Sequence, residues 1–143
     1  MTSWLVPPSS PTGNSRRIEL AGIDLWIFAR TDKVFVYPSE LDIDRLKDAL
    51  SRTLSVWPLV AGRFLLLDGG HYSIEMSDNP IPITYAENTD LATWPANLNI
   101  VAELHHNPLV PFIDEVQIIT LLHGSQDEPL FRLKLTRLVQ SGE

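Results

Sequence analysis

The sequence predicts an α/β fold with a mixed β-sheet, and three patterns support this prediction. Apolar residues recur at three- and four-residue steps over residues 42–57, which is typical of a helix with one buried face. From residue 63 the apolar period changes to two, which is typical of strands. Residues 116–122 are almost continuously apolar, as expected for a strand that is covered on both faces.

The composition is that of one folded domain. The 143 residues are 44% hydrophobic and 20% charged, and the net charge of -7 leaves no basic surface for nucleic acid. The absence of cysteine excludes disulfides and thiolate metal sites, and it fits a reducing compartment. The N-terminus has no basic stretch before an apolar run, and runs such as residues 64–67 are too short to span a bilayer. We therefore expect a cytoplasmic protein without a nucleic-acid or membrane partner.

The N-terminal part of the chain carries few signals. Residues 7–17 are rich in Pro, Ser and Gly, so we expect residues 1–18 to form a loose arm and residues 19–143 to form the domain. Residues 23–28 fit either an early strand or an extended approach to one. Residues 33–37 are predicted to form a strand, because Val, Phe and Tyr favour a pleated surface and a proline closes the run.

The helix over residues 42–57 has both of its ends marked. Asp42 is placed to cap the free amides of the first turn, and Asp44 favours the positive end of the helix dipole. Pro58 ends the helix, because the residue before a proline is biased away from helical geometry. The predicted apolar face consists of Ile43, Leu46, Ala49, Leu50, Thr53, Leu54 and Trp57.

Further strands are predicted after the helix. Residues 63–67 and 72–76 are expected to pair as a hairpin, because the Asp-Gly-Gly-His sequence of residues 68–71 is a turn signal. Residues 81–85 are expected to form another strand. Residues 130–138 alternate cleanly and predict a half-exposed strand, whose apolar face would carry Phe131, Leu133 and Leu135.

Taken together, these segments resemble the N-terminal part of the BAHD superfamily of acyl-CoA-dependent acyltransferases, in a form most similar to the fungal members. The resemblance extends over about residues 20–143 and includes Ala21-Gly22-Ile23-Asp24, Val34-Phe35-Val36-Tyr37-Pro38, Leu46-Lys47-Asp48-Ala49-Leu50-Ser51, residues 58–63 and Pro129-Leu130-Phe131-Arg132-Leu133-Lys134-Leu135-Thr136. It implies a chloramphenicol-acetyltransferase-like fold, of which this chain would be a truncated N-terminal half, built as a mixed-sheet two-layer sandwich.

The resemblance also implies a reaction. In that family a histidine in an H-x-x-x-D motif takes the proton of an acceptor hydroxyl or amine, which then attacks the thioester of acyl-CoA. This histidine and the D-F-G-W-G motif of the C-terminal half both lie beyond the present chain, so we assign no catalytic residue here. We expect the N-terminal segment of an acyltransferase for a small secondary metabolite, inactive alone. Acyl-CoA would be the cosubstrate of the complete enzyme, this segment alone would bind no cofactor, and its partner would be the C-terminal half or a second copy.

One literal H-x-x-x-D pattern is present, from His123 to Asp127. Its context differs from the family's, because the family's histidine follows the strand that residues 130–138 resemble. The aspartate here also precedes Glu128-Pro129, where the family has glycine and small apolar residues. So short a motif occurs readily by chance. We interpret His123 as a turn residue, and a catalytic His123 is the alternative.

The resemblance places Lys33, Phe35 and Tyr37 beside the channel of the fold. We therefore expect these three residues to line the pocket of the acyl acceptor, and a packed core strand is the alternative. Asp24 and Arg63 are expected to be structural, although a lone arginine could also reach a carboxylate.

The remaining candidates predict no metal or phosphate site. The pair His105-His106 has no carboxylate or cysteine at ligand spacing. Gly69-Gly70 predicts a turn rather than a phosphate-binding loop, because no helix pattern and no Lys-Ser/Thr pair follows it. His71 is expected to belong to that turn.

A second functional hypothesis is a stand-alone binding or oligomerisation module that derives from the same fold and has no catalytic activity. It is favoured by the missing base and the missing half. A truncated fold would also leave one sheet edge open, and open edges pair with other chains.

Overall fold

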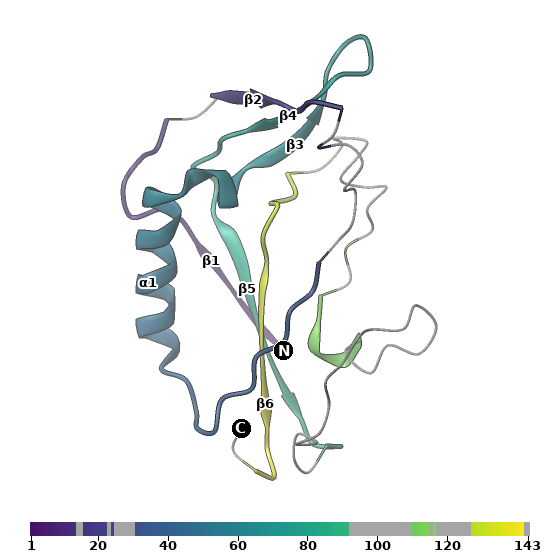
Figure 1. The fold of residues 1–143 in the computed structure, drawn as a ribbon. Coiled ribbons are helices and arrows are strands. Elements are labelled where there is room, and N and C mark those ends of the chain that lie inside the picture. Colours follow the sequence, from purple (N-terminus) through teal and green to yellow (C-terminus); the bar gives the residue numbers. More distant parts are fainter. Residues whose placement is uncertain are drawn as a thin grey trace.

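The computed structural model describes residues 1–13, 16–22, 24, 31–91, 110–114, 116 and 127–141. These residues form one α-helix and two small β-sheets, so the α/β class predicted from the sequence is confirmed (Figure 1). The elements in chain order are β1 (Thr2–Val6), β2 (Arg17–Glu19), α1 (Ile43–Val56), the 3₁₀-helix η2 (Pro58–Ala61), β3 (Arg63–Leu66), β4 (Tyr72–Glu75), β5 (Ile81–Asn88), the 3₁₀-helix η3 (Val110–Phe112) and β6 (Leu133–Leu138).

The first sheet has the strand order β1-β5-β6 and is mixed, as predicted. Strand β5 lies in its centre, antiparallel to β1 and parallel to β6. Trp4 pairs with Ile83, and Ile83 pairs with Leu133, so one row of side chains crosses all three strands on the same face. The predicted strand over residues 81–85 extends to Asn88, and the strand expected over residues 130–138 begins at Leu133.

The second sheet has the order β2-β4-β3 and is antiparallel throughout. It contains the predicted hairpin, in which β3 and β4 are joined by the turn at residues 67–71. Gly69 and Gly70 have φ angles of +84° and +80°, a conformation that strains other residues. The amide of Leu67 donates to the carbonyl of His71 at 2.7 Å and closes the turn. The hairpin prediction is confirmed.

Helix α1 also begins and ends where the sequence predicts. The side chain of Asp42 accepts a hydrogen bond from the amide of Arg45 at 3.0 Å, and the helix ends at Val56, before Trp57 and Pro58. Leu54 is fully buried with Ala61 and Ile81, and Leu50 packs against this cluster. The buried face is narrower than predicted, because Ala49, Thr53 and Trp57 are exposed. Leucines spaced four residues apart lie on the side of the helix that faces the sheet. Ala49, Thr53 and Trp57 lie next to that side and remain exposed.

The N-terminal segment is a correction to the prediction of a loose arm over residues 1–18. It contains β1, which pairs with β5 along its whole length, and the start of β2. Residues 7–13, which we call the N-terminal strap, are bonded to α1: the amide of Ser9 donates to the carbonyl of Ser51 at 3.0 Å, and the Ser9 and Ser55 hydroxyls are 2.9 Å apart. The composition of the strap predicts a loop, but Ser9 of the strap forms hydrogen bonds with residues of α1 that are more than 40 positions away in the sequence.

Residues 33–37 are a second correction, because they do not form the predicted strand. Val, Phe and Tyr have high β-propensity, but propensity reflects packing in a sheet, and this segment joins no ladder in the described part of the chain. The predicted strand at residues 116–122 lies outside the described residues except for Val116. Of the segment at residues 23–28 only Asp24 is described, and the pair His105-His106 and His123 also lie outside the described residues. Among the described helices, none combines the length and apolar character needed to cross a membrane.

Candidate substrate cavity

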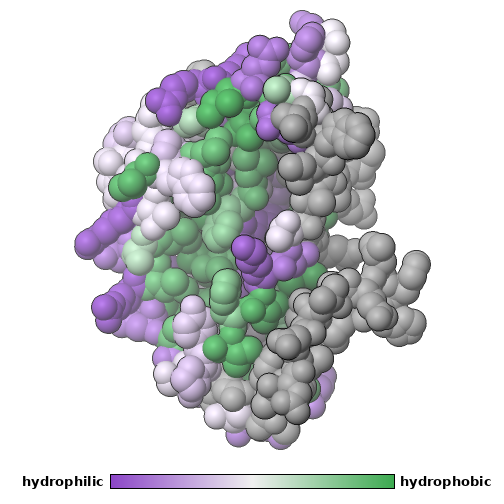
Figure 2. Space-filling model, viewed as in Figure 1, coloured by the Kyte–Doolittle hydropathy of each residue, from purple (hydrophilic) through white to green (hydrophobic). Residues whose placement is uncertain are grey.

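A cavity of about 210 Å³ is lined mainly by residues 33–41, the first turns of α1 and β6, with one residue each from β5 and η3. Its apolar wall comes from Leu46 of α1, Leu133 and Leu135 of β6, Tyr85 of β5 and Phe112 of η3. In the space-filling view, hydrophobic residues gather in a band down the middle of the molecule, in the region where Figure 1 places β5 and β6 (Figure 2). The fold therefore brings residues that are far apart in sequence to one apolar depression.

The cavity borders the whole length of β6. All six residues from Leu133 to Leu138 line it, although alternate residues of a strand point to opposite faces. The lining therefore includes residues from both faces of β6. Strand β6 is also an edge of the sheet in the described part of the chain. Residues 33–37 line the same cavity.

The three residues expected to bind substrate all line this cavity, together with Val34 and Val36. Phe35 is 72% exposed and Tyr37 49% exposed, and Lys33 is exposed as well, whereas Val34 is half-buried. Lys33, Phe35 and Tyr37 are therefore solvent-exposed residues of the lining, and we call this exposed part of the lining the mouth of the cavity. Their exposure does not fit the alternative of a packed core strand.

The two charged side chains that β6 contributes to the lining form ion pairs, one on each face of the strand. Arg137 Nη1 lies 3.5 Å from Oε1 of Glu40, which precedes α1. On the other face, Lys134 Nζ donates to the carbonyl of Ile113 at 3.2 Å and lies 3.9 Å from Oδ1 of Asp114. The hydroxyl of Thr84 donates to Asp114 at 2.8 Å and holds that carboxylate in place. These pairs anchor β6 to the segments on either side of it.

The sequence did not identify the part of the cavity formed by β6, η3 and β5. Alternation over residues 130–138 predicts which leucines share a face, but nothing local indicates that residues 33–37 line the same cavity as these leucines. Strand β6 itself is placed by its parallel pairing with β5, in which Ile83 lies beside Leu133 and Asn88 beside Leu138. Such a contact is tertiary, so no short motif encodes it.

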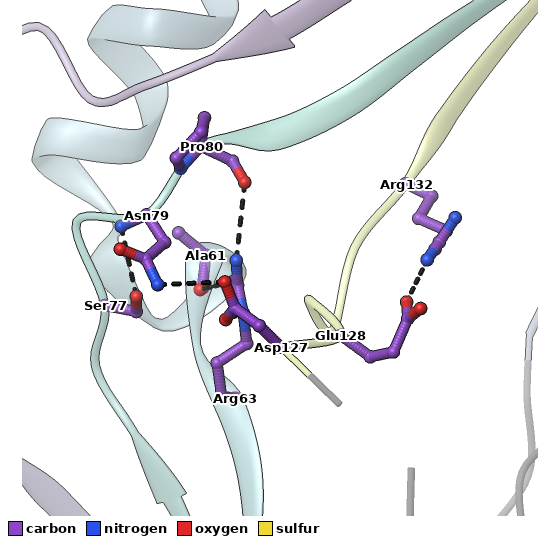
Figure 3. A network of polar contacts seen from close by, with 8 residues as sticks. All are labelled: Ala61, Arg63, Ser77, Asn79, Pro80, Asp127, Glu128 and Arg132. Atoms are coloured by element: carbon purple, nitrogen blue, oxygen red, sulfur yellow. Dashed lines mark hydrogen bonds and ion pairs between the residues drawn. The ribbon is translucent and has the colours of Figure 1, made fainter. Parts of the chain in front are cut away.

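Arg63 is the anchor that the sequence suggested, and its partner is the aspartate of the literal H-x-x-x-D pattern (Figure 3). Its side chain is only 9% exposed, and Nε donates to Asp127 Oδ1 at 2.5 Å. The guanidinium also donates to the carbonyls of Ala61 and Pro80. The second oxygen of Asp127 accepts from Asn79 Nδ2 at 2.9 Å. Both carboxylate oxygens are thus engaged in a structural network at the start of β3.

The remaining candidates occupy structural or surface positions. Asp24 Oδ2 accepts from the amide of Ala21 at 2.9 Å within a short turn, as its structural assignment predicted. His71 is exposed in the hairpin, with Nδ1 3.6 Å from Oε1 of Glu19. In the described part of the chain, no group of three or more His, Asp and Glu residues is placed to hold a metal ion.

The cavity can therefore bind a molecule, but its described residues do not include a base for acyl transfer. No histidine is among the described residues that line it, and the carboxylate among them, Glu40, is paired with Arg137. A comparison with protein families and with curated proteins finds nothing that matches the chain.

Proposed function

We propose that the chain is the N-terminal segment of an acyltransferase, which moves an acyl group from acyl-CoA to a hydroxyl or amine of a small metabolite and is inactive as this segment alone. One observation carries the proposal. Lys33, Phe35 and Tyr37, which the resemblance assigns to the acceptor pocket, lie together at the mouth of an apolar cavity. A concave apolar site with a few polar groups is the usual form of a small-molecule site.

In this proposal the segment contributes substrate binding and the rest of the enzyme contributes the base. General-base acyl transfer needs a group within hydrogen-bond reach of the acceptor proton. The described cavity residues include no histidine, and Asp127 is engaged by Arg63 and Asn79 rather than directed to the cavity. A catalytic histidine from a following segment would complete the site.

The test is to read the coding sequence after Glu143 and to assay the longer chain that it encodes. We expect an in-frame strand followed by His-x-x-x-Asp-Gly, and transfer of labelled acyl groups from acyl-CoA to alcohols or amines by the longer chain. Replacing the histidine of that motif by alanine should abolish transfer, whereas His123→Ala in the same chain should not. Transfer by the 143-residue chain that His123→Ala removes would contradict the proposal.

A second candidate function, a non-catalytic binding or oligomerisation module, is supported by a different observation. Within the described residues, the outer edge of β6 carries no paired strand, and large apolar side chains such as Phe35 and Trp57 are more than half exposed. Open edges and exposed apolar patches are typical of interaction surfaces. An inactive longer chain, together with a stable complex of the 143-residue chain, would favour this module over the acyltransferase.

A further inference from the structure

The mouth of the cavity carries a positive charge without a counter-ion in the described part of the chain. Lys33 is exposed there, and its ammonium forms no ion pair with the described residues. The other two cations of the lining are occupied, because Arg137 is paired with Glu40 and Lys134 with Asp114. Lys33 is therefore the one charge of the described lining that is available to a bound molecule. The chain as a whole, by contrast, has a net charge of -7.

Apart from the mouth, much of the described lining is apolar and can contact the apolar part of a ligand. Leu46, Leu133 and Leu135 contribute aliphatic surface, and Tyr85 and Phe112 contribute aromatic surface. The volume of about 210 Å³ lies under the 300–1,000 Å³ that is common for drug-sized ligands. The space suits a molecule with a short hydrocarbon chain or a single ring better than it suits a folded segment of protein.

We propose that this cavity binds a small apolar carboxylate, with its hydrocarbon or aromatic body against the leucines of β6 and α1 and its carboxylate beside the ammonium of Lys33. The inference rests on the proposed function for what happens next: the bound acid would also carry the hydroxyl or amine that is acylated. A lysine ammonium offers three donors and a carboxylate accepts from several directions, so the pairing makes little demand on geometry.

Charge complementarity distinguishes this occupant from a neutral one. Glu40 also lines the cavity, but its carboxylate is paired with Arg137, so the charge that the described lining leaves uncompensated is positive. The attraction at an exposed lysine is modest and is screened by salt. We therefore expect the carboxylate to add selectivity to binding that is driven by apolar contact.

The experiment compares acids with alcohols of the same skeleton by equilibrium dialysis against the 143-residue chain. The probes are octanoate and octan-1-ol for an aliphatic body, and 3-phenylpropionate and 3-phenylpropan-1-ol for an aromatic body. At low salt we expect each acid that binds to bind more tightly than its alcohol. Whichever of octanoate and 3-phenylpropionate binds more tightly shows whether the cavity prefers an aliphatic or an aromatic ligand.

Three variants test the role of Lys33. Lys33→Gln should weaken acid binding by about two- to five-fold and leave alcohol binding unchanged, in keeping with an exposed ion pair. Lys33→Arg should keep the preference for acids. Arg52→Gln, which removes a positive charge from the exposed side of α1, should change neither. Raising the salt concentration should reduce acid binding by the wild type more than by Lys33→Gln.

Three outcomes would overturn the inference: no binding of any probe, equal binding of acids and alcohols, or an equal loss for Lys33→Gln and Arg52→Gln. The proposed function is judged separately by transfer in the longer chain. Transfer without acid binding would overturn this inference and leave the acyltransferase standing. Acid binding without transfer would support this inference and overturn the acyltransferase.

Discussion

The guanidinium of Arg63 donates to the carboxylate of Asp127 across 64 residues of sequence, and this pair joins the start of β3 to the approach to β6. Two backbone contacts support the same junction: Arg63 forms an isolated bridge with Pro129, and the amide of Leu130 donates to the carbonyl of Gly62 at 3.0 Å. Since β6 forms a wall of the cavity, the pair helps to hold one side of the site in place.

We predict that Asp127→Asn destabilises the protein by about 1–3 kcal/mol, because it leaves the buried guanidinium of Arg63 without a charged partner. A urea titration measures the change. Asp48→Asn is the matched control, since it breaks the exposed pair between Asp48 and Arg52 on α1 and should cost under about 0.5 kcal/mol. Equal losses for the two variants would show that the Arg63 network contributes no more than a surface pair.

Leu54→Ala should cost about 2–5 kcal/mol in the free energy of unfolding, because Leu54 is fully buried between α1, η2 and β5 and its removal leaves a cavity. Leu50→Ala should cost less, since Leu50 is only partly buried. Arg52→Ala on the exposed side should stay under about 0.5 kcal/mol. Similar midpoints for all three in a denaturant titration would mean that the buried face of the helix is assigned wrongly.

The N-terminal strap should depend on pH through Asp78. The hydroxyl of Thr12 donates to Asp78 Oδ1 at 2.6 Å and the Thr12 amide at 2.8 Å, and these bonds, with a further one from Gly13, hold the pKa of that carboxyl below its ordinary value. A lowered native pKa stabilises the fold above the unfolded pKa of roughly 4, and the stabilisation is lost as the pH falls through the native pKa.

We therefore expect the stability difference between wild type and Asp78→Asn to be constant near neutral pH and to shrink as the pH falls below roughly 4. Thr12→Val should remove much of the same pH dependence, because the Thr12 hydroxyl is the largest cause of the shift. Asp68→Asn in the exposed β3–β4 turn controls for the loss of one negative charge. A difference that keeps its size from pH 7 to pH 3 would argue against a role for Asp78 in acid sensitivity.

We predict that the 143-residue chain self-associates at concentrations of tens of micromolar. Phe35 at the cavity mouth and Trp57 at the end of α1 are both exposed, and the outer edge of β6 carries no strand in the described structure. Light scattering of the wild type, Phe35→Ser and Trp57→Ser would show which surface is responsible, with Arg52→Ser as the control. A monodisperse monomer with cooperative unfolding would contradict this prediction.

The parts of the fold that could be predicted from the sequence are those fixed by near neighbours. Asp42, the leucines of α1 and Pro58 define the helix within one short segment, and Gly69-Gly70 defines the hairpin. Strand β1 could not be predicted, because its partner β5 lies far along the chain. Residues 33–37 show the opposite error, since their β-propensity is high but the described structure provides no ladder for them.

The candidate site also has a part that could be predicted from the sequence and a part that depends on distant contacts. Lys33, Phe35 and Tyr37 were named from the resemblance, and the structure places them around one cavity. For Arg63 the sequence predicts a structural role at the start of a strand, but it does not identify Asp127 as the partner. Which carboxylate it reaches depends on the junction between β3 and residues 127–130, and this contact forms only when the two sheets are assembled.

The pairings of the β1-β5-β6 sheet also determine the order in which the chain can assemble during synthesis. Helix α1 and the β3–β4 hairpin involve contacts between nearby residues and can form as soon as they leave the ribosome. By contrast, Thr2 cannot pair until Tyr85 has been synthesised, and Asn88 cannot pair until Leu138 has been synthesised. Strand β1 is thus without its partner until residues 81–88 have been made. Closing such long loops is slow, so β1 is the segment most exposed to mispairing in the nascent protein.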